Sequence, residues 1–374
     1  MVLHLILFAV ALIACSGLPG LFLSRETRTG QTIATALTAL GSIVGLAAAT
    51  FILLSNSNQQ TLALPDWLMT GGLSIKADAL SAFFMVPAFL IGGLGSLYSL
   101  KYWDQTHHQD NGRRMRLFYG SMISGIIIIF IAHHGIVFLV GWEMMALSAF
   151  FLVGTEDNDP KVRQAAWLYL IATHIGTLTL FAMFCLFRQA SGGFDLVPIA
   201  AGAADSGTFA AIFVLALIGF GLKAGMMPLH FWLPPAHASA PSHVSAFMSG
   251  VLIKTGIYGL VRILSLLPTP PAYWGGILLA LGAVSGVIGV AFAIAQHDIK
   301  RLLAYHSVEN IGIILMGLGL AVSGRALGRT DWLLLGMAGC LLHVWNHGLF
   351  KALLFLGAGS VIHEIGRASC RERV

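Results

Sequence analysis

The stretch "GLKAGMMPLHFWLPPAHASAPSHVSAFMSGVLIKTG", Gly221 to Gly256, holds two lysines, three histidines and four prolines directly after the apolar run 209–220. The chain around it avoids charge, because 57% of its 374 residues are hydrophobic and only 10% are charged. Soluble domains carry roughly 25% charged residues, so this chain has too little charge for a surface in contact with water. With a mean hydropathy of +0.83, it is predicted to be a polytopic membrane protein.

The apolar runs predict an all-α fold of about eleven transmembrane helices. They lack the period-two alternation of barrel strands and reach the roughly 20 residues that a helix needs to cross the hydrocarbon. The predicted spans are 3–22, 32–54, 79–100, 117–132, 135–154, 165–186, 208–233, 242–264, 274–296, 302–322 and 332–361. The longest connections, 55–78 and 187–207, are polar or rich in glycine and are predicted to be loops.

The seventh span is predicted to be broken just beyond its lysine, Lys223. Pro228 removes a backbone donor and frees the carbonyl of Ala224, and Pro234 and Pro235 close the segment. Broken helices occur at membrane depth where they line a cavity, and transporters build ion sites in this way.

Charged residues that lie well inside predicted spans include Glu143, Lys223 and Lys254. A charge at mid-helix costs roughly 2.5–3.5 kcal/mol on insertion scales, so each is expected to face a partner or a wet interior. No basic residue lies within four positions of Glu143, so its partner must come from another helix. The simpler alternatives are a structural hydrogen bond for Glu143 and a lysine that reaches the interface for Lys223.

Histidines extend this set of ionisable side chains, and each alone is compatible with a structural role. His230 and His237 lie two helical turns apart at the break, and His243 lies about three turns before Lys254, predicting a shared face. The last span carries three groups at i, i+4 and i+8, which predicts one helix face: His343, His347 and Lys351. His174 is interpreted as structural.

Desolvation disfavours the charged form of a buried lysine, and a nearby carboxylate restores it. Acidic, lysine and histidine groups on separate helices therefore predict a route for stepwise proton movement. A metal site is not predicted. The histidine pair lacks the glutamate of the zinc motif, because Val344 follows His343, and the four cysteines form no CxxC pair.

No nucleotide motif is present, so no cofactor is expected in this chain. The basic residues sit in short loops rather than along one face, so nucleic-acid binding is not expected.

The basic residues also predict the orientation of the chain in the membrane. Ten basic residues follow odd spans: Arg25, Arg28, Lys101, Arg113, Arg114, Arg116, Lys161, Arg163, Lys300 and Arg301. Five follow even spans: Lys76, Arg188, Arg262, Arg325 and Arg329. This excess predicts cytoplasmic odd-span loops and an N-terminus outside the cell membrane.

Four stretches resemble the antiporter-type membrane subunits found in respiratory complex I, Mrp antiporters and membrane-bound nickel–iron hydrogenases. They read "GWEMMALSAFFLVGTE", "LKAGMMPLHFWLPPAHASAPSHVSAFMSGVLIKTGIYGLVRI", "HDIKRLLAYHSVENIGIILMGLG" and "HVWNHGLFKALLFLGAGSVIH". The wording of the second stretch is most similar to the hydrogenase-4 and formate hydrogenlyase branch. The third stretch is interpreted as a conformational or loop element rather than a site, and in it His306 and Glu309 are spaced to pair on one turn.

The resemblance implies that Glu143 pairs with Lys223 and that Lys254, His343, His347 and Lys351 continue the route. It also implies two inverted five-helix repeats, of which the first is complete and the second is truncated before its own broken helix. The expected division is 1–110, N-terminal helices; 111–266, first repeat; 267–363, partial second repeat; and 364–374, a foreign or truncated tail.

The implied function is proton translocation, as a non-redox inner-membrane subunit of an oxidoreductase complex. Its implied partners are other membrane subunits and a peripheral arm that carries iron–sulfur and nickel–iron centres. An Mrp-type cation/proton antiporter subunit is the alternative. A third hypothesis is a non-conducting scaffold, in which buried charges only hold helices together.

Overall fold

The computed structural model describes residues 1–55, 61–64 and 72–365. Within these residues, eleven helical segments are long and apolar enough to cross a membrane, which confirms the predicted all-α polytopic fold. Residues 366–374, most of the predicted foreign tail, lie outside the described part.

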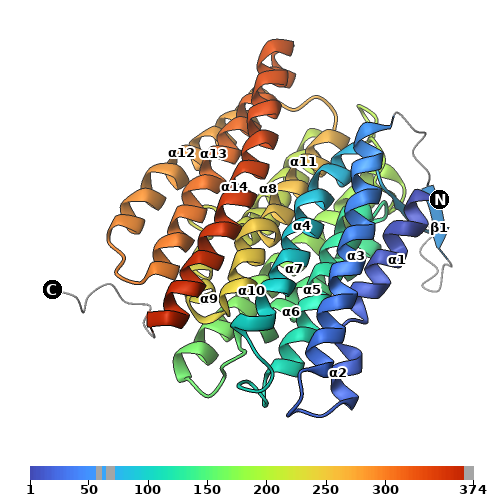
Figure 1. Cartoon of the computed structure of the whole chain (residues 1–374). Helices are drawn as coiled ribbons and strands as arrows, with labels where there is room; N and C mark the ends of the chain where they lie inside the picture. Colours follow the sequence, from blue (N-terminus) through green and yellow to red (C-terminus); the bar gives the residue numbers. More distant parts are fainter. Residues whose placement is uncertain (56–60, 65–71, 366–374) are drawn as a thin grey trace.

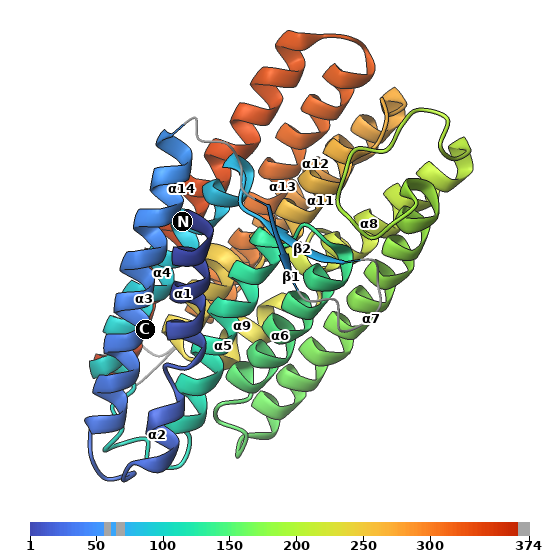
Figure 2. The same cartoon turned by 90° about the vertical axis from the view of Figure 1, so that its right-hand side faces the viewer.

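The first half of the chain runs from one flank of the bundle into its centre (Figure 1). Its elements are α1 (Val2–Ala14), α2 (Leu18–Phe22), α3 (Thr29–Leu54), β1 (Thr61–Leu64), β2 (Leu73–Lys76), α4 (Ala79–Tyr102), α5 (Gly112–Ile131), α6 (Gly135–Val153) and α7 (Pro160–Ser191). The strands β1 and β2 form an antiparallel pair that lies across the outside of the helices (Figure 2). The sequence predicted a loop there, because an amphipathic hairpin leaves no strong hydropathy signal.

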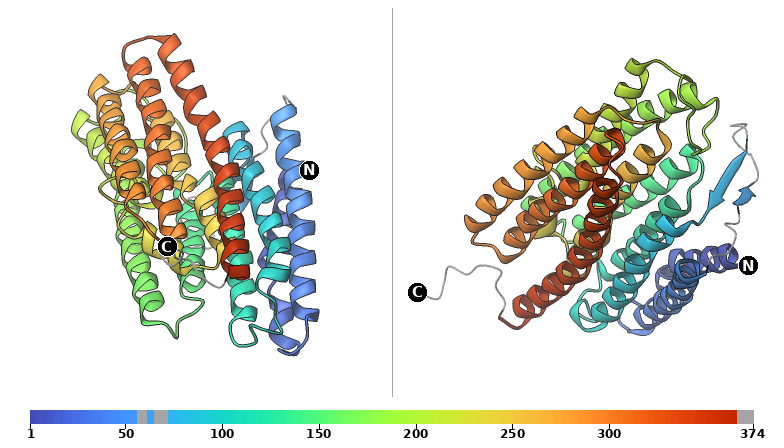
Figure 3. Two further views of the ribbon diagram at one scale, coloured as in Figure 1. Left: turned by 60° about the vertical axis from the view of Figure 1, so that its left-hand side comes forward. Right: turned by 90° about the horizontal axis from the view of Figure 1, so that it is seen from above.

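The second half occupies the centre and the opposite flank, so that α12 and α13 lie far from α1 and α3 in every view (Figure 3). Its elements are α8 (Ser206–Ala224), α9 (Leu233–Ser239), α10 (Ser242–Phe247), the π-helix η1 (Met248–Leu252), α11 (Lys254–Leu266), α12 (Ala272–Ile294), α13 (Ile299–Ala326) and α14 (Thr330–Ile365).

The seventh span is broken, as predicted, but its helix is shorter than predicted. The range 208–233 is wrong at its end, because α8 stops at Ala224 and helix resumes only at α9. Gly225 ends α8 in the left-handed conformation with φ +73°, and its amide bonds back to the carbonyl of Gly221 at 3.0 Å. The indole N–H of Trp232 donates to the carbonyl of Leu222 at 2.8 Å, which satisfies another carbonyl that the end of the helix leaves without a backbone partner.

The eighth span was predicted as one regular helix, and this is wrong at its centre. Five residues from Met248 to Leu252 form a π-helical turn between α10 and α11. A π turn places one extra residue in the ladder and marks functional sites in many helices. The sequence carries no proline here that would reveal it. All 18 residues of the most apolar window in this span are buried, so it is the central helix of the bundle.

Close backbone contact joins α12 and α13 on the outer flank. A Cβ atom on Gly312 would lie 2.5 Å from the carbonyl oxygen of Gly282, and one on Gly282 would lie 2.7 Å from that of Gly312. Only glycine fits at both positions. Association of helices in lipid depends on such small residues, because lipid tails provide no hydrophobic drive.

An ion pair ties the start of α4 to α11. Arg262 makes two parallel hydrogen bonds to Asp78, of 2.6 and 2.8 Å, and Asp78 also caps α4 by accepting from the amide of Ser81. Arg262 is therefore part of a helix, not of a loop as its use in the orientation prediction assumed. Burial acts to raise the pKa of Asp78, but the Arg262 hydrogen bonds and charge, with those from Ser81, lower it to about 2.

We expect Asp78→Asn to lower the stability of the protein by about 2 kcal/mol at pH 7. The pKa of Asp78 in the folded protein, about 2, is below its ordinary value of 3.8. The contribution of Asp78 to the free energy of unfolding is therefore complete above about pH 4 and is lost as the pH falls toward 2. Thermal unfolding in detergent between pH 2 and pH 7 measures this, with Asp331→Asn as the control. Asp331 forms an exposed pair with Arg329. Equal thermal stability of Asp78→Asn and wild type at pH 7 would contradict the assignment.

Candidate functional site

Lys223 lies at the end of a helix inside the protein, not within a helix as the sequence suggested. It stands in the last turn of α8 and is 2% exposed. Its Nζ donates to the hydroxyl of Tyr169 on α7 at 2.9 Å. It also lies over the rings of Tyr169 and Trp142, at 5.1 and 5.7 Å from their centroids. The free carbonyls at a helix C-terminus favour a cation, so this position suits a lysine that is charged for part of the time.

Glu143 of α6 is the acidic residue of this region, and its partner does come from another helix, as predicted. One carboxylate oxygen, Oε2, is 3.9 Å from Nε2 of His174 on α7, while Oε1 is buried without a hydrogen bond. The implied direct pair with Lys223 is not among the ion pairs of the described residues. Glu143 instead acts on Lys223 and Tyr169 through space.

His174 is a partner of Glu143, whereas the sequence suggested only a structural role. Its Nδ1 lies 3.0 Å from the carbonyl of Leu170, which can only accept, so Nδ1 carries a hydrogen. In the neutral ring, Nε2 then presents a lone pair toward the carboxylate across 3.9 Å.

We expect Tyr169→Phe to slow proton transfer through Lys223 about five-fold, which corresponds to the loss of one hydrogen bond to a charged group. The ring that packs on Trp232 is kept, so the fold should be unchanged. The rate of proton translocation by the purified complex measures this, and Tyr273→Phe, at an exposed tyrosine, is the control. An unchanged rate would mean that the hydroxyl does not guide the lysine.

A second group of ionisable side chains surrounds the π turn. Lys254 is 2% exposed, and its Nζ donates to the carbonyl of Ser249 within η1. The hydroxyl of Ser249 lies 2.8 Å from that of Ser307 on α13, which links the turn to the next helix. Lys351 of α14 is also 2% exposed and donates to the carbonyl of Leu303 at 2.9 Å. The charges of Lys254 and Lys351 act on one another.

The predicted shared face of α14 is confirmed. The rings of His343 and His347 are stacked with centroids 6.2 Å apart, and the charge of Lys351 acts on His347. His343 Nε2 lies 2.8 Å from Oδ1 of Asn310, whereas His347 is fully buried with neither ring nitrogen bonded. An unbonded buried imidazole is costly unless water or a moving proton satisfies it.

The three histidines of the opening stretch lie in different surroundings. His237 is fully buried with both ring nitrogens unbonded, and it feels the charges of Lys254, Lys300 and Lys351. His237 therefore belongs to the second group. His230 precedes α9 in the break and is half-buried, with its ring near Phe292 at 6.3 Å.

His243 does not join Lys254, although their spacing predicted a shared face. Its Nε2 contacts the sulfur of Met115 at 3.2 Å, and its ring packs on Tyr102 and Tyr119. The π turn lies between the two residues and changes the rotation that a regular helix would give.

Lys300 is a buried lysine that the sequence placed at a cytoplasmic helix end. It stands in the first turn of α13, is 6% exposed, and donates to the carbonyls of Ala238 and Ala240 at the end of α9. A lysine near a helix start normally reaches solvent, so the sequence holds no sign of this burial. Its contact joins the broken seventh span to the second half of the chain.

Four buried lysines therefore bond to neutral oxygens, and none of them forms an ion pair with a carboxylate among the described residues. Several ammonium groups cannot all be charged in a low-dielectric interior without counter-charge. Lys254 and Lys351 are close enough for the charge of one to act on the other, so these two lysines compete for a proton.

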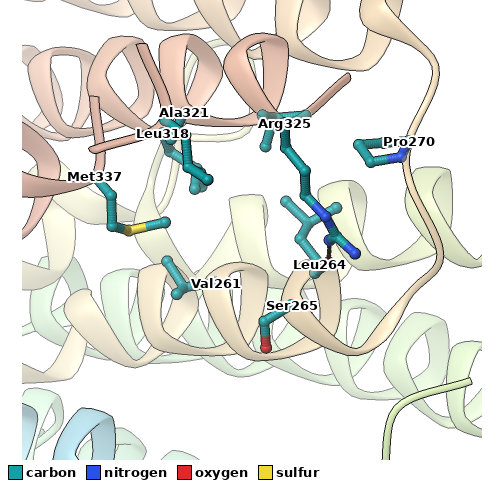
Figure 4. Close-up of a pocket in the computed structure, with 10 residues that line it drawn as sticks. Val261, Leu264, Ser265, Pro270, Leu318, Ala321, Arg325 and Met337 are labelled. Atoms are coloured by element: carbon teal, nitrogen blue, oxygen red, sulfur yellow. Dashed lines mark hydrogen bonds between the residues drawn. The ribbon is translucent and has the colours of Figure 1, made fainter. Parts of the chain in front are cut away.

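An apolar cavity in the described part of the chain is separate from these ionisable residues. It has a volume of about 350 Å3 and lies between α11, α13 and α14, lined by Val261, Leu318 and Met337 among others (Figure 4). Arg325 closes one side and donates to the carbonyls of Leu264 and Leu267 at 2.6 Å each. These two hydrogen bonds give the charged guanidinium of Arg325 a structural role.

The fold is that of a multi-pass membrane protein with several lysines buried in its helix bundle. The chain belongs to the family described as NADH:quinone oxidoreductase/Mrp antiporter, transmembrane, whose model matches residues 132–372. The resemblance expected from the sequence is thus confirmed.

Two of the relatives come from Escherichia coli (strain K12). Hydrogenase-4 component B is 40% identical over 296 residues, 78% of this chain and 44% of that protein. Formate hydrogenlyase subunit 3 is 36% identical over 292 residues, 78% of this chain and 46% of that protein. The chain thus spans less than half the length of these relatives. The Mrp complex from Dietzia sp. DQ12-45-1b shares the fold, with a TM-score of 0.81 at 24% identity over 98% of this chain and 38% of that chain.

Proposed function

We propose that this chain is a proton-translocating membrane subunit of a redox-driven complex of the hydrogenase-4 or formate hydrogenlyase type. The observation that carries the proposal is the row of buried lysines that lack carboxylate contacts. A row of that kind costs stability and has no evident structural advantage over apolar side chains. The presence of these buried lysines is explained if they take and release protons.

The proposed steps link the group around Lys223 to the group around Lys254. A proton held by Glu143 and His174 cancels the negative charge beside Lys223, which favours release of a proton by that lysine. Lys254 receives it, and repulsion from Lys254 then displaces a proton from Lys351, whose charge acts on it. His347 and His237 lie within electrostatic range of both lysines and complete the route.

The proposed placement is the inner membrane, with the N-terminus outside. Residues 111–266 form one repeat, while 267–363 begin a second. Electron transfer takes place in a peripheral arm with iron–sulfur and nickel–iron centres, and other membrane subunits contact this chain. The names of the relatives support the proposed partner subunits, since one is a component of hydrogenase-4 and the other a subunit of formate hydrogenlyase.

An Mrp-type cation/proton antiporter subunit is the second candidate. It is favoured by 29% identity over 315 residues to a component of a probable K(+)/H(+) antiporter of Rhizobium meliloti (strain 1021). The higher identity to the hydrogenase relatives argues for the first candidate. Co-purification separates them, because iron–sulfur and nickel–iron subunits accompany only the first.

The test uses the native complex that contains this chain, purified and reconstituted into liposomes. Addition of a reduced electron donor should move protons across the liposome membrane, and a protonophore should abolish the pH gradient. Electron transfer without proton movement would overturn the proposal. Cation/proton exchange without any donor would establish the second candidate instead.

A further inference from the structure

A second acid–histidine pair lies on α13, outside the route described above. Nδ1 of His306 is 2.5 Å from Oε2 of Glu309, one helical turn away. Their side chains are 36% and 23% exposed, so the pair is reached from outside the packed core. Glu309 packs its backbone against Gly289 of α12. The only titratable side chain on α12 is Tyr273, so that helix provides no competing charge.

A proton must lie between these two atoms. A carboxylate oxygen can only accept, and a bare imidazole nitrogen can only accept, so a contact of 2.5 Å requires one hydrogen between them. In a neutral His306 ring this hydrogen is on Nδ1, so Nε2 is the nitrogen that is open to a further proton.

Asn310 connects this pair to the histidines of α14. Its Nδ2 donates to the carbonyl of His306 at 2.6 Å, so its Oδ1 is turned toward His343. Because that oxygen only accepts, Nε2 of His343 carries the hydrogen. In neutral His343, Nδ1 is then the site that is open to a proton. Asn310 thereby sets the tautomer of His343 and is a positioning residue.

The charge of Glu309 acts on both Lys351 and His343. The same relation holds in the first half, where Glu143 pairs with His174 and acts on Lys223. Each half therefore combines an acid, an imidazole within 4 Å of it, and a buried lysine within electrostatic range. Lys254, His237 and His347 are further titratable residues on helices α11, α9 and α14, which contact α13.

We propose that His306 and Glu309 form a second proton-loading site, which supplies the α14 row. Nε2 of His306 first takes a proton from outside the helix bundle, which gives an imidazolium beside the carboxylate of Glu309. The imidazolium then releases its Nδ1 proton through Oε2 to the neutral amine of Lys351. A neutral imidazole with its hydrogen on Nε2 remains beside the ionised carboxylate, and the next proton restores the imidazolium. This inference rests on the proposed function, because it assigns an entry point to the same proton route.

The test compares four variants in the reconstituted native complex: Glu309→Gln, His306→Gln, the double variant and Glu309→Asp. Electron transfer and proton translocation are measured together. Each glutamine variant should lower the number of protons moved per electron at least about five-fold, as expected for loss of an acid–base group. The double variant should be no worse than either single one, because the residues act as one unit. Glu309→Asp, which keeps the carboxylate, should retain most of the activity.

Asp331→Asn is the matched control, since it removes an acid from an exposed ion pair near the start of α14. Wild-type proton translocation in Glu309→Gln, or additive losses in the double variant, would overturn the inference. If Glu309→Gln does not assemble, His306→Gln decides, because it leaves the carboxylate in place. A failure of the proposed function looks different: the wild-type complex itself would then move no protons.

Discussion

Replacement of Lys223 by methionine should abolish proton translocation, with a loss of about 100-fold or more, as expected when a group that carries the proton is removed. Methionine nearly matches the length of the lysine stem and needs no hydrogen bond. The variant should therefore insert and assemble, and it should be at least as stable as the wild type, because a buried amine without a carboxylate partner is replaced by an apolar group. Proton movement per electron in liposomes measures the effect.

The control for this variant is Lys101→Met, which changes an exposed lysine in the last turn of α4. It should translocate protons at the wild-type rate. Full proton translocation by Lys223→Met, with electron transfer intact, would mean that the lysine only fills space. The scaffold hypothesis would then be preferred.

Lys254→Met should have a loss of the same order, about 100-fold, because this lysine directly follows the π turn and bonds to it. Combination with Lys351→Met should add nothing further, since two steps in series fail together. The reason is the contact pattern: Lys254 bonds to the carbonyl of Ser249, and its charge acts on Lys351. The double variant and both single variants are measured in the same liposome preparation.

Independent partial losses in the two single variants would show parallel routes rather than one row. Intact coupled activity in Lys254→Met would again favour a scaffold. Circular dichroism and co-purification of partner subunits verify in each case that the helices and the complex remain assembled.

The spans could be predicted from the sequence because lipid imposes one strong requirement, about 20 apolar residues for each crossing. The break of the seventh span could also be predicted, since Pro228 and Gly225 leave the backbone few alternatives. Its extent could not, because the apolar residues after Gly225 read as a continued helix although they form a turn.

The ionisable residues were predictable as a set, but their pairings were not. Burial in lipid selects lysines such as Lys223 and Lys254, whereas contacts depend on helix rotation. The π turn at Met248–Leu252 changed that rotation and separated His243 from Lys254. Tyr169 and His174 were missed because a tyrosine or histidine in a membrane helix resembles a packing residue until its neighbour is known.

The central claim is that Lys223, Lys254 and Lys351 form one hydrated row within the bundle. The most direct test is a cryo-electron-microscopy map of the assembled complex in which ordered water is resolved. The account predicts water molecules that connect the three Nζ atoms in an unbroken hydrogen-bonded chain, together with polar groups of the intervening residues. Dry, apolar packing between any two neighbouring lysines would contradict it.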